Sequence, residues 1–318
     1  METTLNIKRL NPEALDPKSY SQEYTIDVPE HYTVLDALIQ IREDLDGSLA
    51  LRCSCRASIC GSCSMRINGQ ASLACKTKLI TLPADGRYVT VGPMGNMPVI
   101  KDLIVDMAPF WNKIKAVDPY LTPADPDPVM AERRSPNEAM VHLAGVMNCI
   151  MCGACVSDCT ALEVDSSFLG PAALAKAYRF VGDPRDGASK ERLEKLNEKS
   201  GVWDCTRCMF CVEVCPKDVN PMGRIMALRE SVISAGHDNT TGARHTIAFG
   251  DLVKKHGRLD ELRLTVRTFG IFNVKAMLGL MPVGFRALIR GKMPPLLPHS
   301  IPGVEGVRRI FQKVEAKK

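Results

Sequence analysis

The run "CTRCMFCVEVCP" at residues 205–216 places four cysteines in the spacing Cx2Cx2Cx3C and closes them with a proline. An earlier run, "CIMCGACVSDCT" at residues 149–160, repeats this spacing with a threonine in place of the proline. The packing of small side chains gives no reason for the same spacing to occur twice. We therefore interpret both runs as ligand sets for metal centres.

The cysteine content of the whole chain supports this interpretation. Thirteen cysteines stand in 318 residues, and the chain begins with the mixed polar stretch "METTLNIKRLNPEALD". This start lacks the apolar segment of a secretory signal, so we expect a reducing compartment in which cysteines bind metals instead of forming disulfides. The length predicts two or three domains.

A third group of cysteines lies nearer the start of the chain. The stretch "CRASICGSC" has the Cx4Cx2C spacing of plant-type ferredoxins and predicts a [2Fe–2S] cluster. The predicted ligands are Cys55, Cys60, Cys63 and Cys75. Gly61 permits the close backbone approach that such a loop needs. A structural zinc site is the alternative, although zinc ligands usually come as two CxxC pairs. Cys53 falls outside the spacing and is interpreted as a spare thiol.

The doubled run matches the pattern of bacterial two-cluster ferredoxins, in which the fourth cysteine of each run ligates the cluster of the other. Paired zinc sites are the alternative for these two runs. The predicted ligands of a [4Fe–4S] cluster are Cys149, Cys152, Cys155 and Cys215. The predicted ligands of a third cluster are Cys159, Cys205, Cys208 and Cys211.

The first hundred residues predict a small mixed β-sheet crossed by one helix. "TLNIKRL" (4–10) and "EYTIDVP" (23–29) alternate apolar and polar residues as half-buried strands do. "SMRINGQASLAC" (64–75) reads as two strands joined by an Asn-Gly turn. "TVLDALIQIREDL" (33–45) places its apolar residues on one helical face, with Thr33 as the predicted N-cap.

The remainder of the chain is predicted to be helical, which makes the fold class α+β. "VIKDLIVDMAPFWNKIKAV" (99–117) predicts a helix, and the proline-rich stretch that follows it predicts an extended connector. The predicted domains are a [2Fe–2S] domain at 1–105, a helix and connector at 106–136, a helical two-cluster domain at 137–235 and a basic helical extension at 236–318.

The extension carries the positive charge of the chain. Residues 236–318 hold 15 Lys and Arg against 6 Asp and Glu. Such a tail suits an acidic partner, anionic lipid or nucleic acid, and the alternative is a solvated helical tail with no partner. Aromatic residues make up only 5% of the chain and the basic residues lie on amphipathic helices, so we expect no nucleic-acid partner.

The order of these elements resembles the iron–sulfur subunit of succinate dehydrogenase and fumarate reductase. The stretches that carry the resemblance are "SCRASICGSC", "PVIKDLIVDM", "DPYL", "FLGPAALAKAYRF" and "CPKDVNPMGRI". The resemblance covers roughly residues 1–235. It implies a β-grasp domain followed by a helical ferredoxin-like domain, and an electron-transfer role beside an FAD-containing flavoprotein subunit. The sequence has no GxGxxG motif, no P-loop and no nucleophile–base pair, so FAD and substrate are expected on the other chain.

Two departures from that family concern the third cluster. In most members an aliphatic residue stands at the position of Cys208, and three cysteines hold a [3Fe–4S] centre. The cysteine here favours [4Fe–4S], with [3Fe–4S] as the alternative. The family's quinone pocket near this cluster draws on a tryptophan and a histidine, whereas the corresponding stretches here read "CTALEVD" and "CTRC".

The C-terminal region, from "FGDLVKKHGRLDELRLTVRTFG" (249–270) to "LLPHSIPGVEGVRRIF" (296–311), resembles the C-terminal part of small iron–sulfur subunits of heterodisulfide reductases. This implies the subclass that pairs with a heterodisulfide-reductase-like third subunit, and it makes a subunit of a heterodisulfide-reductase-type complex the alternative function. The longest uncharged apolar stretch of this region, residues 276–285, is too short to span a bilayer. We expect a peripheral membrane-associated subunit on the cytoplasmic face of the inner membrane.

Overall fold

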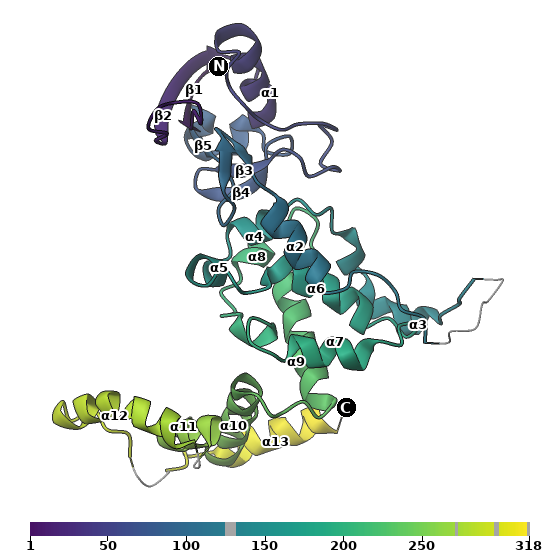
Figure 1. The fold of residues 1–318 in the computed structure, drawn as a ribbon, viewed down its shortest axis with the longest axis vertical. Helices are drawn as coiled ribbons and strands as arrows, with labels where there is room; N and C mark the ends of the chain where they lie inside the picture. Colours follow the sequence, from purple (N-terminus) through teal and green to yellow (C-terminus); the bar gives the residue numbers. More distant parts are fainter. Residues whose placement is uncertain (125–131, 271–272, 296–298, 317–318) are drawn as a thin grey trace. The chain divides into compact units, whose positions relative to one another are not determined.

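The computed structural model describes residues 1–124, 132–270, 273–295 and 299–316. The chain divides into two units, Met1–Ser231 and Val232–Lys318. The first unit carries the β-sheet and the cysteine runs, and the second is built from helices (Figure 1). Residues 125–131 of the predicted connector lie outside the described part of the chain.

A mixed sheet organises the first domain (Figure 1). Its strands are β1 (Glu2–Arg9), β2 (Tyr20–Asp27), β3 (Ser64–Ile67), β4 (Gln70–Leu73) and β5 (Tyr88–Gly92). The strand order is β2-β1-β5-β3-β4. Strand β1 pairs in parallel with β5, whereas the other neighbours are antiparallel. This is the mixed sheet that the sequence predicts.

One helix covers the sheet and closes its core. Helix α1 (Val34–Gln40) continues into a π-helical turn over Ile41–Leu45. The fully buried side chains of Leu35 and Leu38 join the alternating inward side chains of β1 in one apolar cluster. Burial of such side chains contributes about 1.5–3 kcal/mol each, so this cluster is the main source of stability in the domain.

Two local signals in the sequence form as predicted. The Thr33 hydroxyl accepts the Asp36 N–H at 3.3 Å, and the Asp36 carboxylate accepts the Thr33 N–H at 2.9 Å. This reciprocal capping box begins helix α1. In the hairpin between β3 and β4, Asn68 and Gly69 have φ angles of 49° and 84°. Positive φ at both positions is the geometry of the Asn-Gly turn that the sequence indicates.

The prediction of a helix over residues 99–117 is wrong in its first half. A short hairpin forms there from β6 (Val99–Lys101) and β7 (Ile104–Val105). Helix α2 (Ala108–Ala116) begins only after this hairpin. The helical periodicity of the stretch is therefore overridden by tertiary contacts.

Asp102 supplies those contacts. It sits at the turn of the hairpin with φ 47° and is 2% exposed. Its carboxylate accepts the backbone N–H groups of Leu10 and Ala50, each at 2.9 Å. The Nε atom of Arg9 lies 2.9 Å from the same carboxylate. A buried charge needs such partners, and a helical backbone would withdraw Asp102 from them.

Short helices follow each cysteine run in the rest of the first unit (Figure 1). The helices are α3 (Asn137–Met140), α4 (Ala154–Ser157), α5 (Thr160–Val164), α6 (Gly170–Val181), α7 (Ser189–Leu196), α8 (Phe210–Glu213) and α9 (Pro221–Ser234). Helices α4 and α8 each begin one residue before the third cysteine of a run, Cys155 and Cys211, so this cysteine lies in the first turn of the helix.

The second unit has helices α10 (Thr241–His256), α11 (Glu261–Phe269), α12 (Val274–Ile289) and α13 (Val304–Glu315). A small core of Ala248, Leu252 and Leu264 holds α10 against α11. Among the helices that the structure describes, none combines the length and the apolar character that a membrane crossing requires.

Candidate iron–sulfur centres

The loop over residues 55–63 gathers backbone N–H groups around a cysteine sulfur. The Cys55 Sγ accepts the N–H groups of Ala57, Ile59 and Cys60 at 3.3, 3.4 and 3.3 Å. The loop therefore supplies the kind of hydrogen bonds that stabilise cluster sulfurs.

The other predicted ligands of this loop lie beside it in different surroundings. The Cys75 Sγ accepts the Ser58 N–H at 3.4 Å, which ties the distant fourth cysteine to the loop. The side chain of Ser62 lowers the pKa of Cys60 to about 6. Burial and, to a smaller extent, the neighbouring Cys75 thiolate raise the pKa of Cys63 to about 12. The structure thus brings these thiols together with Cys55.

The same loop lies against the first of the two cysteine runs. Gly61 has φ 73°, and a Cβ atom built on it would stand 2.8 Å from the Cβ of Cys152. The two residues are in backbone contact although the first belongs to the sheet domain and the second to the helical part. Only a glycine fits this position.

Asp158 joins the helical part to the sheet domain through hydrogen bonds. Its Oδ2 accepts the Ala71 N–H at 2.8 Å, and its Oδ1 accepts the Arg66 Nε–H at 3.1 Å. Asn96 adds bonds from its Nδ2 to the carbonyls of Val156 and Cys159 at 2.8 and 3.0 Å. These contacts fix the first cysteine loop relative to the second group of thiols.

The two runs share one backbone conformation. Met151 and Gly153 have positive φ angles of 56° and 80° in the first run. Their counterparts in the second run, Arg207 and Met209, have φ angles of 60° and 73°. Left-handed conformations at non-glycine residues are uncommon, so their repetition at the same places is specific. Cys208 therefore occupies in the second run the place that Cys152 has in the first.

The first run and the last cysteine of the second converge on one cavity. Its lining includes Cys149, Cys152, Cys155 and Cys215 together with apolar side chains such as Phe110. Burial raises the pKa of Cys155 well above its usual range, and the nearby thiolates, Cys215 among them, raise it further. Thiols crowded in an apolar cavity gain from a cluster, because its irons take the thiolate charge. This donor set fits an iron–sulfur cluster.

The remaining four thiols of the two runs also lie together. Burial and, to a smaller extent, the thiolates of Cys205, Cys159 and Cys208 raise the pKa of Cys211 to about 12. Cys159 comes from the first run and the other three from the second. A thiol of the first run thus lies close to thiols of the second.

Cys208 differs from the thiols around it. It is exposed, and its Sγ accepts the hydroxyl of Thr160 at 3.5 Å. Partial burial acts to raise the pKa of Cys208, but hydrogen bonds from the Thr160 hydroxyl and the Phe210 N–H outweigh it, and the net shift is downward. The shift is opposite in direction to those of Cys159 and Cys211, whose pKa values are raised by burial.

None of the thirteen cysteines, all of which lie in the described residues, is paired in a disulfide. Within that part of the chain, no three His, Cys, Asp or Glu side chains are placed to hold a single metal ion. Cluster ligands bind different iron atoms and stand farther apart than ligands of one ion. Cys53 is half-buried and packs against the core of the sheet domain.

Arg229 is a positioning residue that the sequence pattern did not reveal. It is 8% exposed, and its guanidinium donates to the carbonyls of Val202, Trp203 and Cys205 at 2.9, 3.1 and 2.7 Å. It therefore fixes the backbone that enters the second run. No spacing rule points to a residue fourteen positions beyond the last cysteine.

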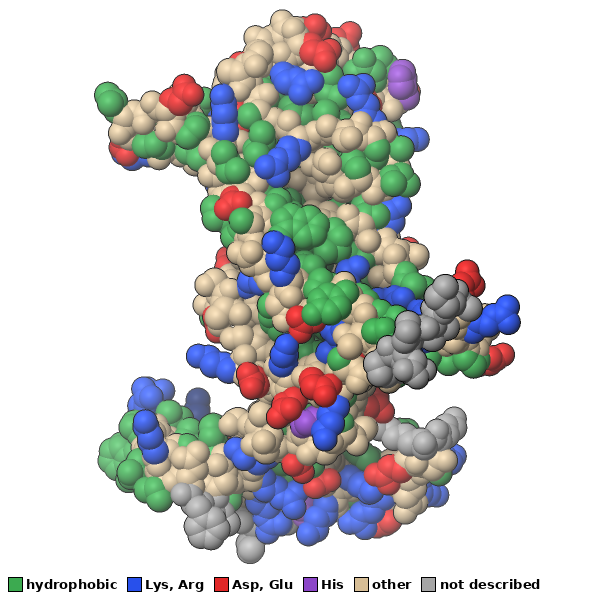
Figure 2. Space-filling model, turned by 45° about the vertical axis from the view of Figure 1, so that its right-hand side comes forward, with side chains coloured by type: hydrophobic (Ala, Val, Ile, Leu, Met, Phe, Trp, Pro, Cys, Tyr) green, Lys and Arg blue, Asp and Glu red, His purple; other side chains and the backbone are tan. Residues whose placement is uncertain are grey.

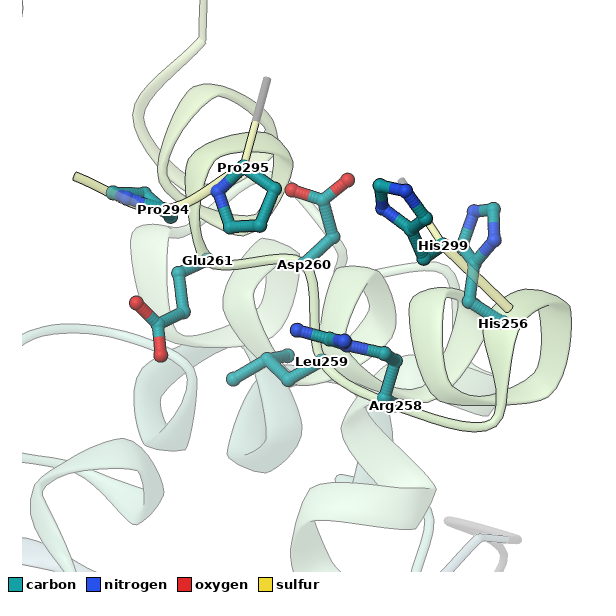
Figure 3. Close-up of a pocket in the computed structure, with 8 residues that line it drawn as sticks. All are labelled: His256, Arg258, Leu259, Asp260, Glu261, Pro294, Pro295 and His299. Atoms are coloured by element: carbon teal, nitrogen blue, oxygen red, sulfur yellow. The ribbon is translucent and has the colours of Figure 1, made fainter. Parts of the chain in front are cut away.

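The second unit has a small cavity of its own near the end of α10 (Figure 3). His256, Asp260 and His299 are among the residues that line it. The His256 Nδ1 lies 3.3 Å from the Ser300 hydroxyl. Burial lowers the pKa of His256, and the charges of Lys255 and Arg263 lower it further, so the ring is neutral at pH 7.

Comparisons with known proteins agree with this arrangement of cysteines. Residues 4–112 match the family described as a 2Fe-2S iron-sulfur cluster binding domain. Residues 145–219 match the family described as a 4Fe-4S dicluster domain. The chain is 39% identical over 233 residues to the succinate dehydrogenase iron-sulfur subunit of Coxiella burnetii, an alignment covering 72% of this chain and 97% of the relative.

The chain belongs to the family of succinate dehydrogenase and fumarate reductase iron–sulfur subunits.

Further relatives extend the similarity. The 8-methylmenaquinol:fumarate reductase iron-sulfur subunit of Wolinella succinogenes is 32% identical over 312 residues, which covers 94% of this chain and 95% of the relative. That alignment includes most of residues 236–318. A chain of the Mycobacterium smegmatis Sdh1 complex in the apo form has a TM-score of 0.68 and 26% identity, covering 75% of this chain and 98% of its own.

Membership of this family confirms the predicted fold class and the predicted kind of protein, an iron–sulfur electron-transfer subunit of a succinate dehydrogenase or fumarate reductase. It also confirms that [2Fe–2S] and [4Fe–4S] binding domains are present. The predicted subclass and the nature of the third cluster are finer questions.

Proposed function

We propose that this chain relays electrons between a flavoprotein subunit carrying FAD, where succinate and fumarate interconvert, and a membrane-side quinone-reactive subunit. The observation that carries the proposal is the continuity of the three thiol groups. The first lies against the second at Gly61 and Cys152. Thiols of the two runs also lie near one another, because, in addition to burial, Cys211 and Cys215 raise the pKa of Cys155 and Cys159 raises that of Cys211. Electron transfer requires that neighbouring redox centres lie close together, as these contacts would place them.

The ligand sets are part of this proposal. We assign the [2Fe–2S] cluster to Cys55, Cys60, Cys63 and Cys75. We assign a [4Fe–4S] cluster to Cys149, Cys152, Cys155 and Cys215. We assign the third cluster to Cys159, Cys205, Cys208 and Cys211. When bound, these clusters accept and release single electrons; the protein's part is to hold the thiolates, exclude water and supply N–H groups to the sulfurs.

We propose that the third cluster is [4Fe–4S] and not [3Fe–4S]. Support comes from Cys208, which stands in the second run as Cys152 stands in the first, with positive φ angles on the same two neighbours. The Thr160 hydroxyl bond and the lowered pKa of Cys208 favour a thiolate there. A fourth thiolate leaves no corner iron without a protein ligand.

We also propose a redox partner, a third subunit and a membrane position for this chain. The Wolinella relative aligns along nearly the whole chain, and its name couples fumarate reduction to a methylated menaquinol. This favours a quinone as the ultimate redox partner and a third subunit on the membrane side of the chain. We propose a heterodisulfide-reductase-like subunit in that place, and a peripheral position on the cytoplasmic face of the membrane.

We keep the domain limits 1–105, 106–136, 137–235 and 236–318 as working boundaries. They are supported by the family matches over residues 4–112 and 145–219 and by the division of the chain after Ser231. The first family match extends past the first limit into helix α2, which follows the sheet domain in the sequence and packs against α6 of the helical part.

Anaerobic metal analysis of the full-length chain tests this function. The proposal predicts about ten irons per chain, from one [2Fe–2S] and two [4Fe–4S] clusters, and a brown colour that dithionite bleaches. Co-purification from native membranes should also recover a flavin-containing subunit. Zinc in place of iron, or about two irons alone, would show that the assignment of the two runs is wrong.

A further inference from the structure

Helix α12 (Val274–Ile289) turns its large apolar side chains to the solvent. No side chain of this helix is buried. Seven of its large apolar residues are 55–69% exposed: Val274, Leu278, Met281, Val283, Phe285, Leu288 and Ile289. At 3.6 residues per turn, all of these except Val283 fall on one side of the helix. A surface helix of a globular protein normally faces such a side toward the core.

A neighbouring side of α12 is less exposed, and its half-buried residues are Ala276, Met277, Leu280, Gly284 and Ala287. The most exposed side of the helix is therefore the one with the most large apolar side chains, whereas three of the five half-buried residues are small. A contiguous exposed apolar face of this kind marks a surface that binds a membrane or another molecule.

The charges beside this face are all of one sign. Lys275, Arg286 and Arg290 are exposed and lie along one flank of the apolar side. In the sequence, no Asp or Glu occurs between Glu261 and Glu305, whereas Lys and Arg occur six times in that interval. Figure 2 shows hydrophobic side chains next to Lys and Arg side chains in the lower part of the view, where this unit is drawn.

We propose that α12 lies in the interface of a membrane that contains anionic phospholipid, with its apolar side in the acyl boundary and its cations at the phosphates. An apolar side flanked by cations with no acidic residue is the composition of interfacial helices. Its 16 residues give a length of about 24 Å, which suits a helix lying in the membrane plane.

Two other occupants fit the charges less well. A second copy of this chain docking on the same face would bring two sets of cations together without a compensating carboxylate. A protein partner would have to present an apolar groove edged with acidic residues. An anionic lipid surface offers both an apolar environment for the exposed side chains and negative charge for the cations. Each cation near such a surface contributes about fivefold to binding.

Co-sedimentation of the full-length, cluster-loaded chain with vesicles tests the proposal. We expect binding to vesicles of one part phosphatidylglycerol to three parts phosphatidylcholine and much weaker binding to phosphatidylcholine alone. Replacing Phe285 and Leu278 together by Gln should weaken binding more than tenfold. Replacing Lys275, Arg286 and Arg290 together by Gln should weaken it on the order of a hundredfold.

Val283→Gln is the matched control, because Val283 is equally exposed on the same helix but outside the apolar side. It should bind as the unchanged chain does. The proposal is overturned if the full chain stays in the supernatant with all vesicles, or if Val283→Gln weakens binding as much as Phe285→Gln with Leu278→Gln. It is also overturned if sedimentation velocity finds a dimer that the Phe285 and Leu278 changes dissociate.

The inference adds a membrane contact to the proposed function but does not depend on electron transfer. Vesicle binding is measured without turnover, and cluster content is followed by visible absorbance in the same samples. A chain that holds its iron but fails to bind vesicles would refute the lipid contact alone.

Discussion

Gly61 lies against Cys152, so close that a Cβ on the glycine would stand 2.8 Å from the Cβ of the cysteine. The contact joins a loop of the sheet domain to the first cysteine run of the helical part. Since both residues lie within proposed ligand segments, the packing of two domains and the spacing of two redox centres depend on the same point.

Gly61→Ala should weaken the contact between the [2Fe–2S] loop and the first cysteine run. The substitution forces a Cβ into a left-handed backbone, which costs about 1–2 kcal/mol, and into Cys152, where overpacking adds roughly 1–3 kcal/mol. We expect the [2Fe–2S] absorbance to be lost at lower urea concentration. Gly69→Ala is the control, since Gly69 has φ 84° but nothing within 4 Å of its built Cβ. Equal effects of the two changes would mean that the contact with Cys152 is unimportant.

Asp158→Ala should separate the sheet domain from the helical part. It removes the acceptor of the buried Ala71 N–H, which costs about 1–3 kcal/mol, and the acceptor of Arg66, whose side chain is 42% exposed and loses less. Hydrogen–deuterium exchange in the peptide that contains Ala71 should become faster. Asp165→Ala, which changes an exposed aspartate beyond Cys159, should leave this exchange unaltered. Unchanged exchange in the Asp158 variant would contradict the docking role.

Arg229→Met should damage the third centre selectively. Three carbonyls at the entry to the second run lose their donor, and the loop that presents Cys205 loses its anchor. We expect about four fewer irons per chain with the [2Fe–2S] spectrum retained. Arg229→Lys should keep part of the iron, because a single ammonium can replace some of the three bonds. Arg258→Met, at an exposed arginine, controls for the change of charge.

Cys208→Val should convert the third centre from [4Fe–4S] to [3Fe–4S]. The fourth thiolate is removed while Cys159, Cys205 and Cys211 remain, so one corner iron has no protein ligand. Electron paramagnetic resonance of the oxidised variant should show the sharp signal of a trinuclear cluster, which the oxidised unchanged chain lacks. The same signal at one spin per chain in an undamaged, unchanged sample would refute the [4Fe–4S] assignment.

Much of the architecture follows from local signals in the sequence. The alternation in β1, the Asn-Gly turn and the Thr33 capping box each act over a few residues, and each forms as predicted. The hairpin at residues 99–105 could not be predicted in this way, because it depends on Asp102 meeting Arg9, Leu10 and Ala50.

The candidate iron–sulfur centres could likewise be predicted only in part from local signals in the sequence. Cysteine spacing grouped the twelve thiols, since ligands of one cluster recur at fixed short intervals. The residues that position them gave no such signal. Arg229 acts through three carbonyls, and Asp158 acts across a domain boundary, so both become visible only when distant segments meet in the fold.

The crossing of the two runs is the central claim, and one comparison tests it directly. In the Cys208→Val background the third centre carries its own paramagnetic signal. Cys215→Ala should then lower the iron content by about four and leave that signal in place, because Cys215 belongs with the first run. Cys159→Ala should remove the signal. If Cys215→Ala abolishes the signal and Cys159→Ala spares it, each run holds its own cluster and the crossed arrangement is wrong.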